Sequence, residues 1–359
     1  MELPEKTRAD LGWDTLLEHL ARRARTGRGE KLARALAPLP DLDSARARHE
    51  EVQEARALRD TGCALPLDGV RDLDDALGRA GKGGALDPQT LRDVGSTLTT
   101  GARVRRHLIE RASRAPRLLG RAALISDLDD VSGPIGDAFD PGDSGARLAD
   151  RASAALGGLR RRAQKVREEL ERKVGTLLDA GHVAPHLQDR FATQRDDRYV
   201  IPVRVDARAK VRGIVHGTSQ SGQTVFVEPE EIVELNNRLK LAELEVAEEE
   251  RRILAELSRL VEEALPRIHV NLEVLAVLDL LDAAARLSSD LRATAPELEE
   301  SGPLDLRRAR HPLMVLRSLE ASDSSGAGDE PRSTERACVP NDILLGFGQT
   351  LVVSGPNAG

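Results

Sequence analysis

Hydrophobic residues recur at alternating spacings of three and four positions through two long stretches of the chain, from about residue 146 to 179 and from about 232 to 266. This spacing places an apolar seam along one side of a helix and is typical of a coiled coil. At 1.5 Å per residue, each helix would be about 50 Å long, so the two match in length. The seam residues are Leu148, Ala152, Leu156, Leu159, Ala163, Val166, Leu170, Val174 and Leu177, then Ile232, Leu235, Leu239, Ala242, Val246, Ile253, Leu257 and Leu260.

The segment between these stretches, residues 183 to 230, has a different pattern. Short runs rich in β-branched residues, at 199–205, 211–215 and 223–227, are separated by turn sequences rich in Ser, Gly and Asp. This arrangement predicts a small antiparallel sheet. Helix, sheet and equally long helix together predict an arm that runs out, carries a β-rich tip and returns as an antiparallel helix.

The charges of the two long helices favour this pairing. Residues 151–173 hold eight Arg or Lys against three Glu, whereas residues 228–250 hold nine Glu against one Arg and one Lys. If residue 179 lies opposite about 231, Lys165 and Arg167 face Glu245 and Glu243, as flanking pairs of a coiled coil do. We therefore favour intramolecular pairing for the run 160–162 (Arg-Arg-Arg), with nucleic-acid contact as the alternative.

Helical patterns also dominate residues 12–125, so a helical first domain is expected. Its basic cluster, Arg22, Arg23, Arg25 and Arg28, favours a solvated helix face over contact with a phosphate backbone. Residues 126–145 are acidic and rich in Gly and Pro, which predicts a loop. A further helix is expected at about 271–291, and a domain boundary near residue 300. The fold class is therefore mainly α.

Composition narrows the function classes. The 359 residues favour two or three domains. A formal net charge of -7 excludes a globally basic nucleic-acid binder, so any site for a polyanion must be local. Cys63 and Cys338 have no metal-ligand spacing and fit a reducing cytoplasm. Because no apolar run approaches the about 18 residues of a membrane span, we expect a cytoplasmic protein without a membrane partner.

The β-rich tip is locally basic. Residues 190–216 contain seven Arg or Lys against three Asp. Basic side chains on a projecting sheet neutralise phosphates without reading bases. The alternative is a hairpin whose Arg residues protect its edges from aggregation, and we favour DNA contact. The predicted DNA-binding residues are Arg195, Arg198, Arg204, Arg208, Lys210 and Arg212.

Other candidate chemistry is weaker. His182 and His186 have a ligand-like spacing, but Pro185 lies between them and no third ligand is evident, so no metal is predicted. Ser219, Ser221 and His216 do not form a nucleophile motif, and no catalytic residue is predicted. The Ser and Gly residues at 219–222 are interpreted as turn chemistry.

The last nine residues combine an expected buried strand at 351–353 with a glycine-bearing run. Residues 355–359 fit the first five of eight positions of the phosphate-binding pattern GxxxxGK[ST], whose glycines let backbone amides wrap phosphates. The alternative is an ordinary turn after a strand. The lysine and hydroxyl of the pattern would lie beyond Gly359, so we expect the chain as given neither to bind ATP tightly nor to hydrolyse it.

Several stretches together resemble the MutS-like ATPases, in particular a bacterial branch called here MutS-two. They are RYVIPVR at 198–204, GIVHGTSQSGQTVFVEP at 213–229, ELNNRL at 234–239, ARHPLM at 309–314, VPNDILLG at 339–346 and VVSGPNAG at 352–359. Residues 20–41 are similar to the start of the family's core domain.

This resemblance implies a domain order. It assigns 1–130 to a helical core domain, 131–182 to a connector and outgoing lever helix, and 183–230 to a β-rich clamp. Residues 231–265 would form the returning lever helix, 266–300 a second part of the core, and 301–359 the first portion of an ABC-type α/β ATPase domain. The resemblance to this branch also predicts that the mismatch-reading and connector domains of classical MutS are absent.

The resemblance also implies ligands and partners. Gly355, Pro356, Asn357, Ala358 and Gly359 match the family's phosphate loop, and Val339 and Pro340 match positions that border the adenine. The full-length protein is therefore expected to bind ATP and Mg²⁺ and to form a homodimer. Neither ATP nor Mg²⁺ is expected to bind to this chain. A C-terminal nuclease domain of the Smr type would lie outside these residues.

Three functions follow as hypotheses. The first is a DNA-binding part of an ATPase that grips duplex or branched DNA by its backbone and suppresses homologous recombination. The second is a ribosome-binding ATPase that senses and splits collided ribosomes, since A-form RNA also presents backbone and shape to a basic tip. The third is a structural coiled-coil arm without a polyanion partner.

Overall fold

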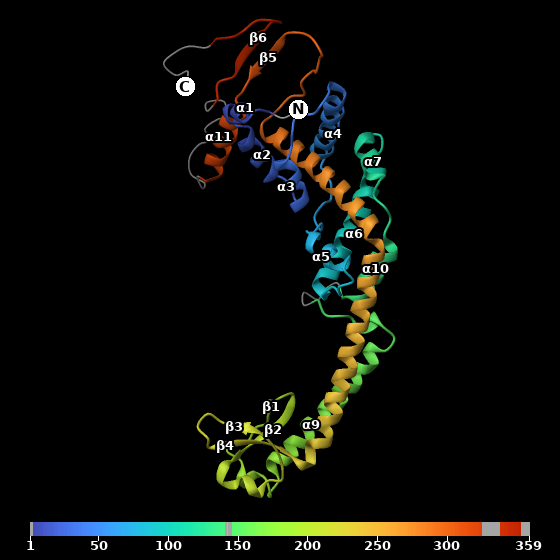
Figure 1. Ribbon diagram of the computed structural model, residues 1–359, viewed down its shortest axis with the longest axis vertical. Coiled ribbons are helices and arrows are strands. Elements are labelled where there is room, and N and C mark those ends of the chain that lie inside the picture. The colour runs from blue at the N-terminus through green and yellow to red at the C-terminus, as the bar shows by residue number, and fades with distance from the viewer. Residues whose placement is uncertain (1–2, 141, 143–145, 325–337, 353–359) are drawn as a thin grey trace. The chain divides into compact units, whose positions relative to one another are not determined.

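The computed structural model describes residues 3–140, 142, 146–324 and 338–352. Helices predominate among them, together with two small antiparallel sheets, which confirms the mainly α fold class (Figure 1). The chain divides into two compact units, which are described separately. Unit 1 comprises residues 1–77, 93–132 and 263–359, and unit 2 comprises residues 78–92 and 133–262.

Unit 1 is built on the C-terminal part of the long helix α10 (Glu230–Asp290), against which shorter helices pack. Its main core joins Leu58, Leu108, Leu118 and Leu278, all at most 1% exposed. The helices in this unit are α1 (Glu5–Leu11), α2 (Trp13–Ala21), α3 (Gly27–Arg34), α4 (Leu42–Asp60), most of α6 (Pro88–Ile109), α7 (Pro116–Ala122) and α11 (Pro312–Ser324), and α5 (Asp74–Ala80) and α8 (Asp129–Ala138) begin in it.

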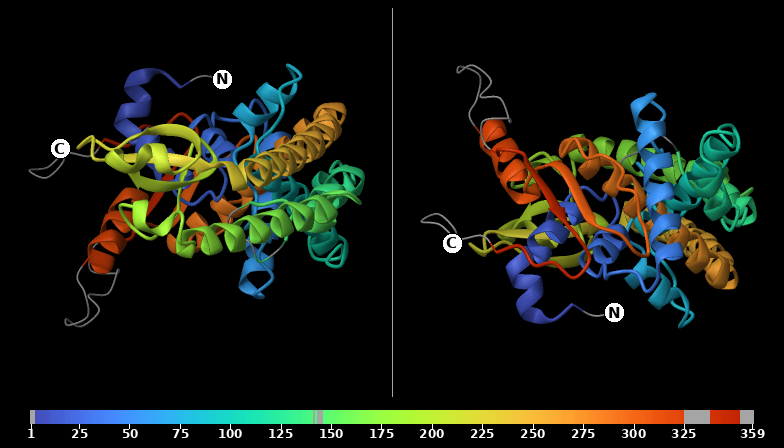
Figure 2. Two further views of the ribbon diagram at one scale, coloured as in Figure 1. Left: turned by 90° about the horizontal axis from the view of Figure 1, so that it is seen from below. Right: turned by 90° about the horizontal axis from the view of Figure 1, so that it is seen from above.

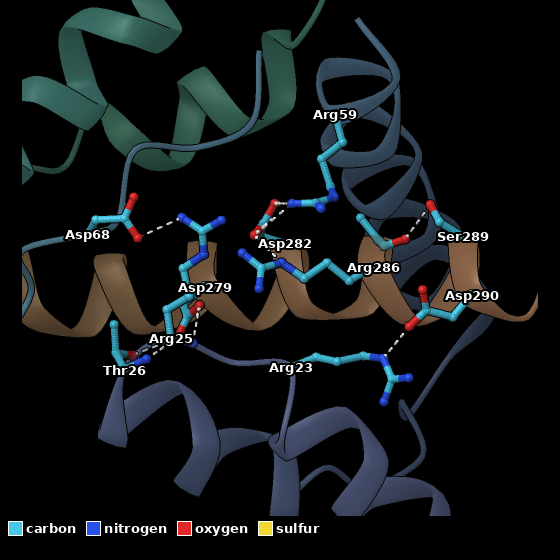
Figure 3. A network of polar contacts seen from close by, with 11 residues as sticks. Arg23, Arg25, Thr26, Arg59, Asp68, Asp279, Asp282, Arg286, Ser289 and Asp290 are labelled. Atoms are coloured by element: carbon cyan, nitrogen blue, oxygen red, sulfur yellow. Dashed lines mark hydrogen bonds and ion pairs between the residues drawn. The ribbon is translucent and has the colours of Figure 1, made fainter. Parts of the chain in front are cut away.

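A buried carboxylate of α10 fixes the N-terminal segment of unit 1 (Figure 3). Asp279 is fully buried and accepts hydrogen bonds from the backbone N–H groups of Arg25 and Thr26, at 3.0 and 2.8 Å, and from the Thr26 hydroxyl at 2.7 Å. The Thr26 hydroxyl oxygen in turn accepts from the Gly29 N–H, which caps α3. Burial raises the pKa of Asp279, while the bonds from Thr26 and Arg25 oppose that rise.

A second carboxylate one turn further along α10 organises two arginines. Asp282 is 1% exposed and pairs with Arg59 of α4 and with Arg286 of its own helix, both at 3.1 Å (Figure 3). Burial lowers the pKa of Arg286, and the nearby Asp282 opposes this shift. Together the two carboxylates join α3 and α4 to one face of α10.

Unit 2 contains the antiparallel helix pair that the seam predicts, formed by α9 (Leu156–Asp179) and the first part of α10, which lie side by side in Figures 1 and 2. Leu156, Leu170 and Ile232 are completely buried at the seam. Arg167 contacts Glu243 at 2.6 Å, as predicted, whereas Glu245 pairs with Arg162 at 2.8 Å and not with Lys165. This antiparallel helix pair is the lever.

The tip of the lever, residues 183–230, is the clamp, and it contains a four-stranded antiparallel sheet with the order β1-β2-β4-β3. Its core joins Ile201, Val203 and Val227 to Leu170 and Val174 of α9. The strands are β1 (Thr193–Arg195), β2 (Arg198–Arg204), β3 (Gly213–Thr218) and β4 (Thr224–Pro229), with short 3₁₀ helices η1 (Asp150–Ala152), η2 (Ala184–His186) and η3 (Val205–Lys210) in the same unit.

The second sheet pairs β5 (Leu304–Ala309) with β6 (Asn341–Leu345) in unit 1. Before α11, the backbone N–H of His311 donates to the buried Cys338 sulfur at 3.2 Å. Leu351 and Val352 lie outside any strand and are 57% and 81% exposed, so the buried strand expected there is wrong for these two residues. The third residue of that prediction, Val353, lies outside the described residues.

Three other boundaries differ from the prediction, two of them because packing overrides a local signal. Residues 129–138 form helix α8 and not a loop, since Val131, Ile135 and Ala138 line one buried stripe despite the Gly and Pro content. The first lever helix starts at Leu156 and not near 146. The second continues through Pro266 into the helix expected at 271–291, because Ala264 and Ile268 are buried on either side of the proline.

Among the described residues, no helix combines the length and the apolar character that crossing a membrane requires.

Candidate nucleic-acid interface

The two faces of the clamp sheet differ in chemistry. In antiparallel strands, directly opposite residues share a face, and faces alternate along each strand. Ile201 lies opposite Val227, and Val203 opposite Val225, so these valines and isoleucine form the face that packs on the lever. The same register places Arg195, Arg198 and Arg204 on the other face, with Phe226 and Ile214.

A buried glutamate holds this second face together. Glu228 of β4 is 0% exposed, and its carboxylate accepts from the Arg198 guanidinium at 2.8 Å and from the Asn236 amide at 2.9 Å. Its other oxygen lies 2.7 Å from His216 Nε2. A buried carboxylate without partners destabilises a fold. The three side chains Arg198, Asn236 and His216 together offset the burial of the Glu228 carboxylate.

Asn236 joins the clamp to the start of α10. Its side-chain oxygen accepts from the Tyr199 N–H at 3.0 Å, and its amide donates to the Tyr199 carbonyl at 3.1 Å. The side chain thus pairs with β2 as a neighbouring strand does. The next residue, Asn237, accepts from Arg198 at 2.8 Å. The sheet is therefore fixed to the lever by hydrogen bonds as well as by its apolar face.

Two of the predicted DNA-binding arginines are engaged inside the clamp. Arg198 has the contacts just described and a side chain that is 27% exposed. Arg208 donates to the backbone carbonyls of Val211 and Gly213, both at 2.8 Å, and closes η3 onto β3. At Gly213, φ is 154°, and an added Cβ would collide with the carbonyl of Glu228, so this crossing requires glycine. The hydrogen bonds of both arginines therefore hold parts of the clamp together.

The other four predicted residues are exposed to solvent. Arg195 lies over the Phe226 ring, 4.4 Å from its centroid, which orients its guanidinium. Arg204 forms a two-point pair with Asp206 at 3.2 Å. Lys210 and Arg212 are exposed, and neither side chain has a hydrogen bond or ion pair with any residue that the structure describes. Lys210, Arg212 and Arg195 are therefore the cations most available to a ligand.

The predicted nucleotide site falls mostly outside the described residues, which end before Gly355, Pro356, Asn357, Ala358 and Gly359. Val339 is 71% exposed, and Pro340 is half-buried just before β6. Neither has a charged or hydrogen-bonding side chain. The nucleotide assignment therefore stays a prediction.

Glu228 and Asn236 are important for the clamp, but the charge pattern of the sequence alone did not predict them. Both occur in the motif sequences FVEP and ELNN, and the signal in each case is a polar side chain among apolar neighbours. Glu228 follows the buried Val227 and precedes the buried Pro229. A charged side chain between buried apolar residues is stable only when hydrogen-bond or ion-pair partners surround it.

Comparison with known proteins gives one consistent result. The chain is 40% identical over 367 residues to the Endonuclease MutS2 of Anaeromyxobacter sp. (strain Fw109-5), 35% identical over 358 residues to that of Symbiobacterium thermophilum, and 31% identical over 359 residues to that of Clostridioides difficile (strain 630). Each comparison covers 99% of this chain and 42–43% of the relative, so the chain spans less than half the length of these relatives. No protein-family model matches it.

Proposed function

We propose that this chain, which belongs to the MutS2 type of MutS-like ATPase across the residues that it spans, forms the part that grips DNA. The proposal rests on a difference between two groups of cations in the clamp. Arg198 and Arg208 are bound internally, whereas Lys210 and Arg212 are exposed without described partners. Lys210 ends η3 and Arg212 directly precedes β3, in the segment that Arg208 closes through Val211 and Gly213. Cations on a segment that is held in place neutralise phosphates at a small entropic cost.

The composition of the exposed clamp surface favours contact with the DNA backbone over base reading. Stacking of bases uses aromatic platforms, and Phe226 is already covered by Arg195. Arg and Lys that act on phosphates position a duplex without carrying sequence information. The proposed substrate is therefore duplex or branched DNA, selected by shape.

In the longer protein we propose that this grip is coupled to ATP hydrolysis and serves to suppress homologous recombination. This step rests on the resemblance of residues 339–346 and 352–359 to the ATPase domain of the family. The name Endonuclease MutS2 describes the relatives, and a nuclease domain would belong to the additional length that they possess.

The test is a salt series of DNA binding by the 359-residue chain, with a four-way junction and a linear duplex as ligands. The double variant Lys210→Ala/Arg212→Ala is compared with Lys6→Ala/Arg106→Ala, which removes the same charge from exposed positions of unit 1. Loss of two phosphate contacts should reduce the slope of log K against log salt by about 2. The control variant should keep the slope.

Unchanged affinity and slope in the clamp variant would exclude Lys210 and Arg212 as the DNA contact and overturn the proposal that rests on them. Purified ribosomes form a third arm of the same experiment. Binding to ribosomes with no measurable binding to either DNA at low salt would replace DNA by a ribosomal partner.

A further inference from the structure

Two neighbouring apolar side chains of the clamp are exposed on an edge strand. The strand order places β3 at one edge of the sheet, and Ile214 and Val215 of this strand are 50% and 45% exposed. Edge strands of soluble proteins are usually protected by charged residues, proline or a bulge. A bulge lies between Val215 and Thr218, after the two apolar residues. It therefore leaves both of them exposed to water.

The two side chains lie on opposite faces of the sheet. Val215 lies opposite Val227, on the face that packs on the lever. Ile214 lies opposite Glu228, on the face that also carries the arginines of β1 and β2. Ile214 is thus an exposed apolar side chain on the cationic face of the clamp.

Exposed cations directly precede Ile214 in the chain. Lys210 ends η3, and Arg212 lies two residues before Ile214. Both cations are exposed, and the side chain of neither has a partner among the residues that the structure describes. Asp206, the acidic residue of η3, is paired with Arg204. The segment that leads into Ile214 is therefore locally basic.

Two acidic residues also lie close to this segment. Glu228 is buried opposite Ile214, and two basic side chains contact its carboxylate. Glu230 is exposed, and its N–H donates to the Arg212 carbonyl at 3.1 Å. Because the charge of Glu228 is offset inside the fold, the two exposed cations outnumber the one exposed carboxylate of this pair. Positive charge therefore remains beside Ile214.

The backbone at Ile214 is held in place by its neighbours. Arg208 donates to the Gly213 carbonyl at 2.8 Å, and the crossing at Gly213 requires glycine. Across the ladder, Ile214 pairs with Glu228, which is fixed by its own contacts. The β-branched side chain of isoleucine also has few rotamers. Ile214 therefore presents its apolar surface at a small entropic cost.

We propose that Ile214 packs against the face of a base pair at a DNA branch point, while Lys210 and Arg212 neutralise the phosphates beside it. This role of Ile214 rests on the proposed function of the clamp in binding DNA. It makes one apolar side chain the determinant of a preference for branched over linear DNA. Contact with the face of a base pair does not depend on which base is present, so it adds no sequence specificity.

The structure of DNA at a branch point accounts for the preference. In a continuous duplex, each base pair is stacked between two others, so an apolar side chain has to separate a step before it can insert. At a branch point, the two base pairs that meet are not joined by both strands, and their separation costs less. Apolar residues such as isoleucine and leucine insert in this way in proteins that kink DNA. Ile214 should therefore contribute to the binding of a junction and not of a linear duplex.

The charges around Ile214 favour DNA over a protein partner. A standard protein interface buries roughly 800 Å² per partner, whereas the apolar surface of Ile214 is a single side chain beside two cations. A branch point combines an accessible base-pair face with phosphates on either side of it. This combination matches the arrangement of Ile214, Lys210 and Arg212.

The test compares Ile214→Thr with the wild type on a four-way junction and on a linear duplex of the same number of base pairs. Threonine is also β-branched and favours strands, so β3 should stay folded. Burial of the exposed half of an isoleucine side chain is lost, which should weaken junction binding about fivefold to tenfold and duplex binding less than about twofold. The salt slope should stay unchanged on both DNAs, because no phosphate contact is removed.

Two other variants of the same strand serve as controls. Val215→Thr makes a similar change on the other face of the sheet and should keep the preference for the junction. Ile214→Val keeps an apolar, β-branched side chain and should retain most of the preference. Hydrogen exchange of the β4 amides should be the same in all three variants, which checks that the sheet is intact.

A 2-aminopurine base at the branch point reports the contact directly, since its fluorescence rises when it loses a stacking neighbour. The wild type and Val215→Thr should raise the emission, and Ile214→Thr should not. Equal losses of junction and duplex affinity in Ile214→Thr would overturn the role of Ile214. Unchanged junction affinity would do the same and would favour a protein partner for this side chain.

The variant Lys210→Ala/Arg212→Ala separates the role of Ile214 from the proposed function. If that variant lowers the salt slope while Ile214→Thr changes neither affinity, the clamp binds DNA without a contact from Ile214. If the wild type binds neither DNA at low salt, the proposed function fails, and the role of Ile214 fails with it.

Discussion

The N-terminal segment of unit 1 and the clamp of unit 2 are both rich in arginine, yet the structure uses the two groups differently. Arg23, Arg25 and Arg28 pair with Asp290, Asp68 and Asp74 at 2.6 to 3.0 Å, so this cluster is neutralised within the fold. In the clamp, Lys210 and Arg212 have no such described partner. The number of charges along the sequence does not distinguish the two groups. The acidic partners that the fold places beside each arginine do distinguish them.

The comparison extends to the buried carboxylates. Asp279 holds the N-terminal segment through backbone N–H groups, whereas Glu228 holds the clamp through side chains. The first anchors a helix start and the second anchors a cation that the sequence placed among the DNA contacts. Each carboxylate holds its region in place. The exposed cations Lys31 and Arg34 of α3 are paired with Asp74 and Glu18, whereas Lys210 and Arg212 of the clamp have no side-chain partner among the described residues.

The largest expected effect is on unit 1. Asp279→Ala removes the acceptor of Arg25 and Thr26 and should destabilise unit 1 by about 4 kcal/mol, because buried donors lose their partner. Trp13 is the single tryptophan and lies in α2, so urea unfolding followed by its fluorescence measures this unit. The control Asp68→Ala, at an 82% exposed side chain, should cost less than about 1 kcal/mol. Equal effects of the two variants would contradict the anchoring role of Asp279.

A smaller effect is expected in the clamp. Arg198→Ala leaves Glu228 buried with a partner missing and should reduce the local stability of the sheet by about 3 kcal/mol. Hydrogen exchange of the β2 and β4 amides measures it. Arg195→Ala is the matched control, since the stacked and exposed Arg195 should contribute only about 0.5 to 1 kcal/mol. If Arg198→Ala weakened DNA binding while exchange stayed unchanged, Arg198 would be a direct contact and not an anchor.

The next largest effect is expected on the stability of the lever, at the start of α9. Ser153 accepts from the N–H of Leu156, the first residue of α9, at 3.0 Å, and donates to Glu249 at 2.6 Å. Ser153→Ala should destabilise the lever by about 1 kcal/mol. Hydrogen exchange of the first α9 amides should rise, while exchange in the clamp core should not.

Glu249 also predicts a pH dependence. Hydrogen bonds from Arg252 and Ser153 lower the pKa of Glu249 from 4.5 to about 2. A folded pKa below the unfolded value contributes stability above about pH 4.5, and this contribution is lost as the pH falls toward 2. Ser153→Ala should raise the pKa of Glu249, measurable by NMR titration, and make the acid-induced loss of stability smaller. An unchanged titration would show that Arg252 alone sets the pKa.

The smallest effect sharpens the comparison of the two basic groups. Arg25→Ala/Arg28→Ala should change the affinity for the four-way junction by less than about twofold, because both guanidinium groups already have acidic partners. The salt slope should also stay constant. A loss as large as that of Lys210→Ala/Arg212→Ala would assign DNA contact to the N-terminal segment as well.

The sequence by itself determined the lever and the sheet, because apolar periodicity is a local property that burial then satisfies at residues such as Leu170, Ile232 and Val227. The register of two antiparallel helices also predicted the pair Arg167–Glu243, although Glu245 pairs with Arg162 and not with Lys165. Only the tertiary structure decided that α8 is a helix and that α10 continues through Pro266. It also decided which clamp cations are exposed, because the partners of Arg198 and Glu228 come from strands and a helix whose positions no local pattern encodes.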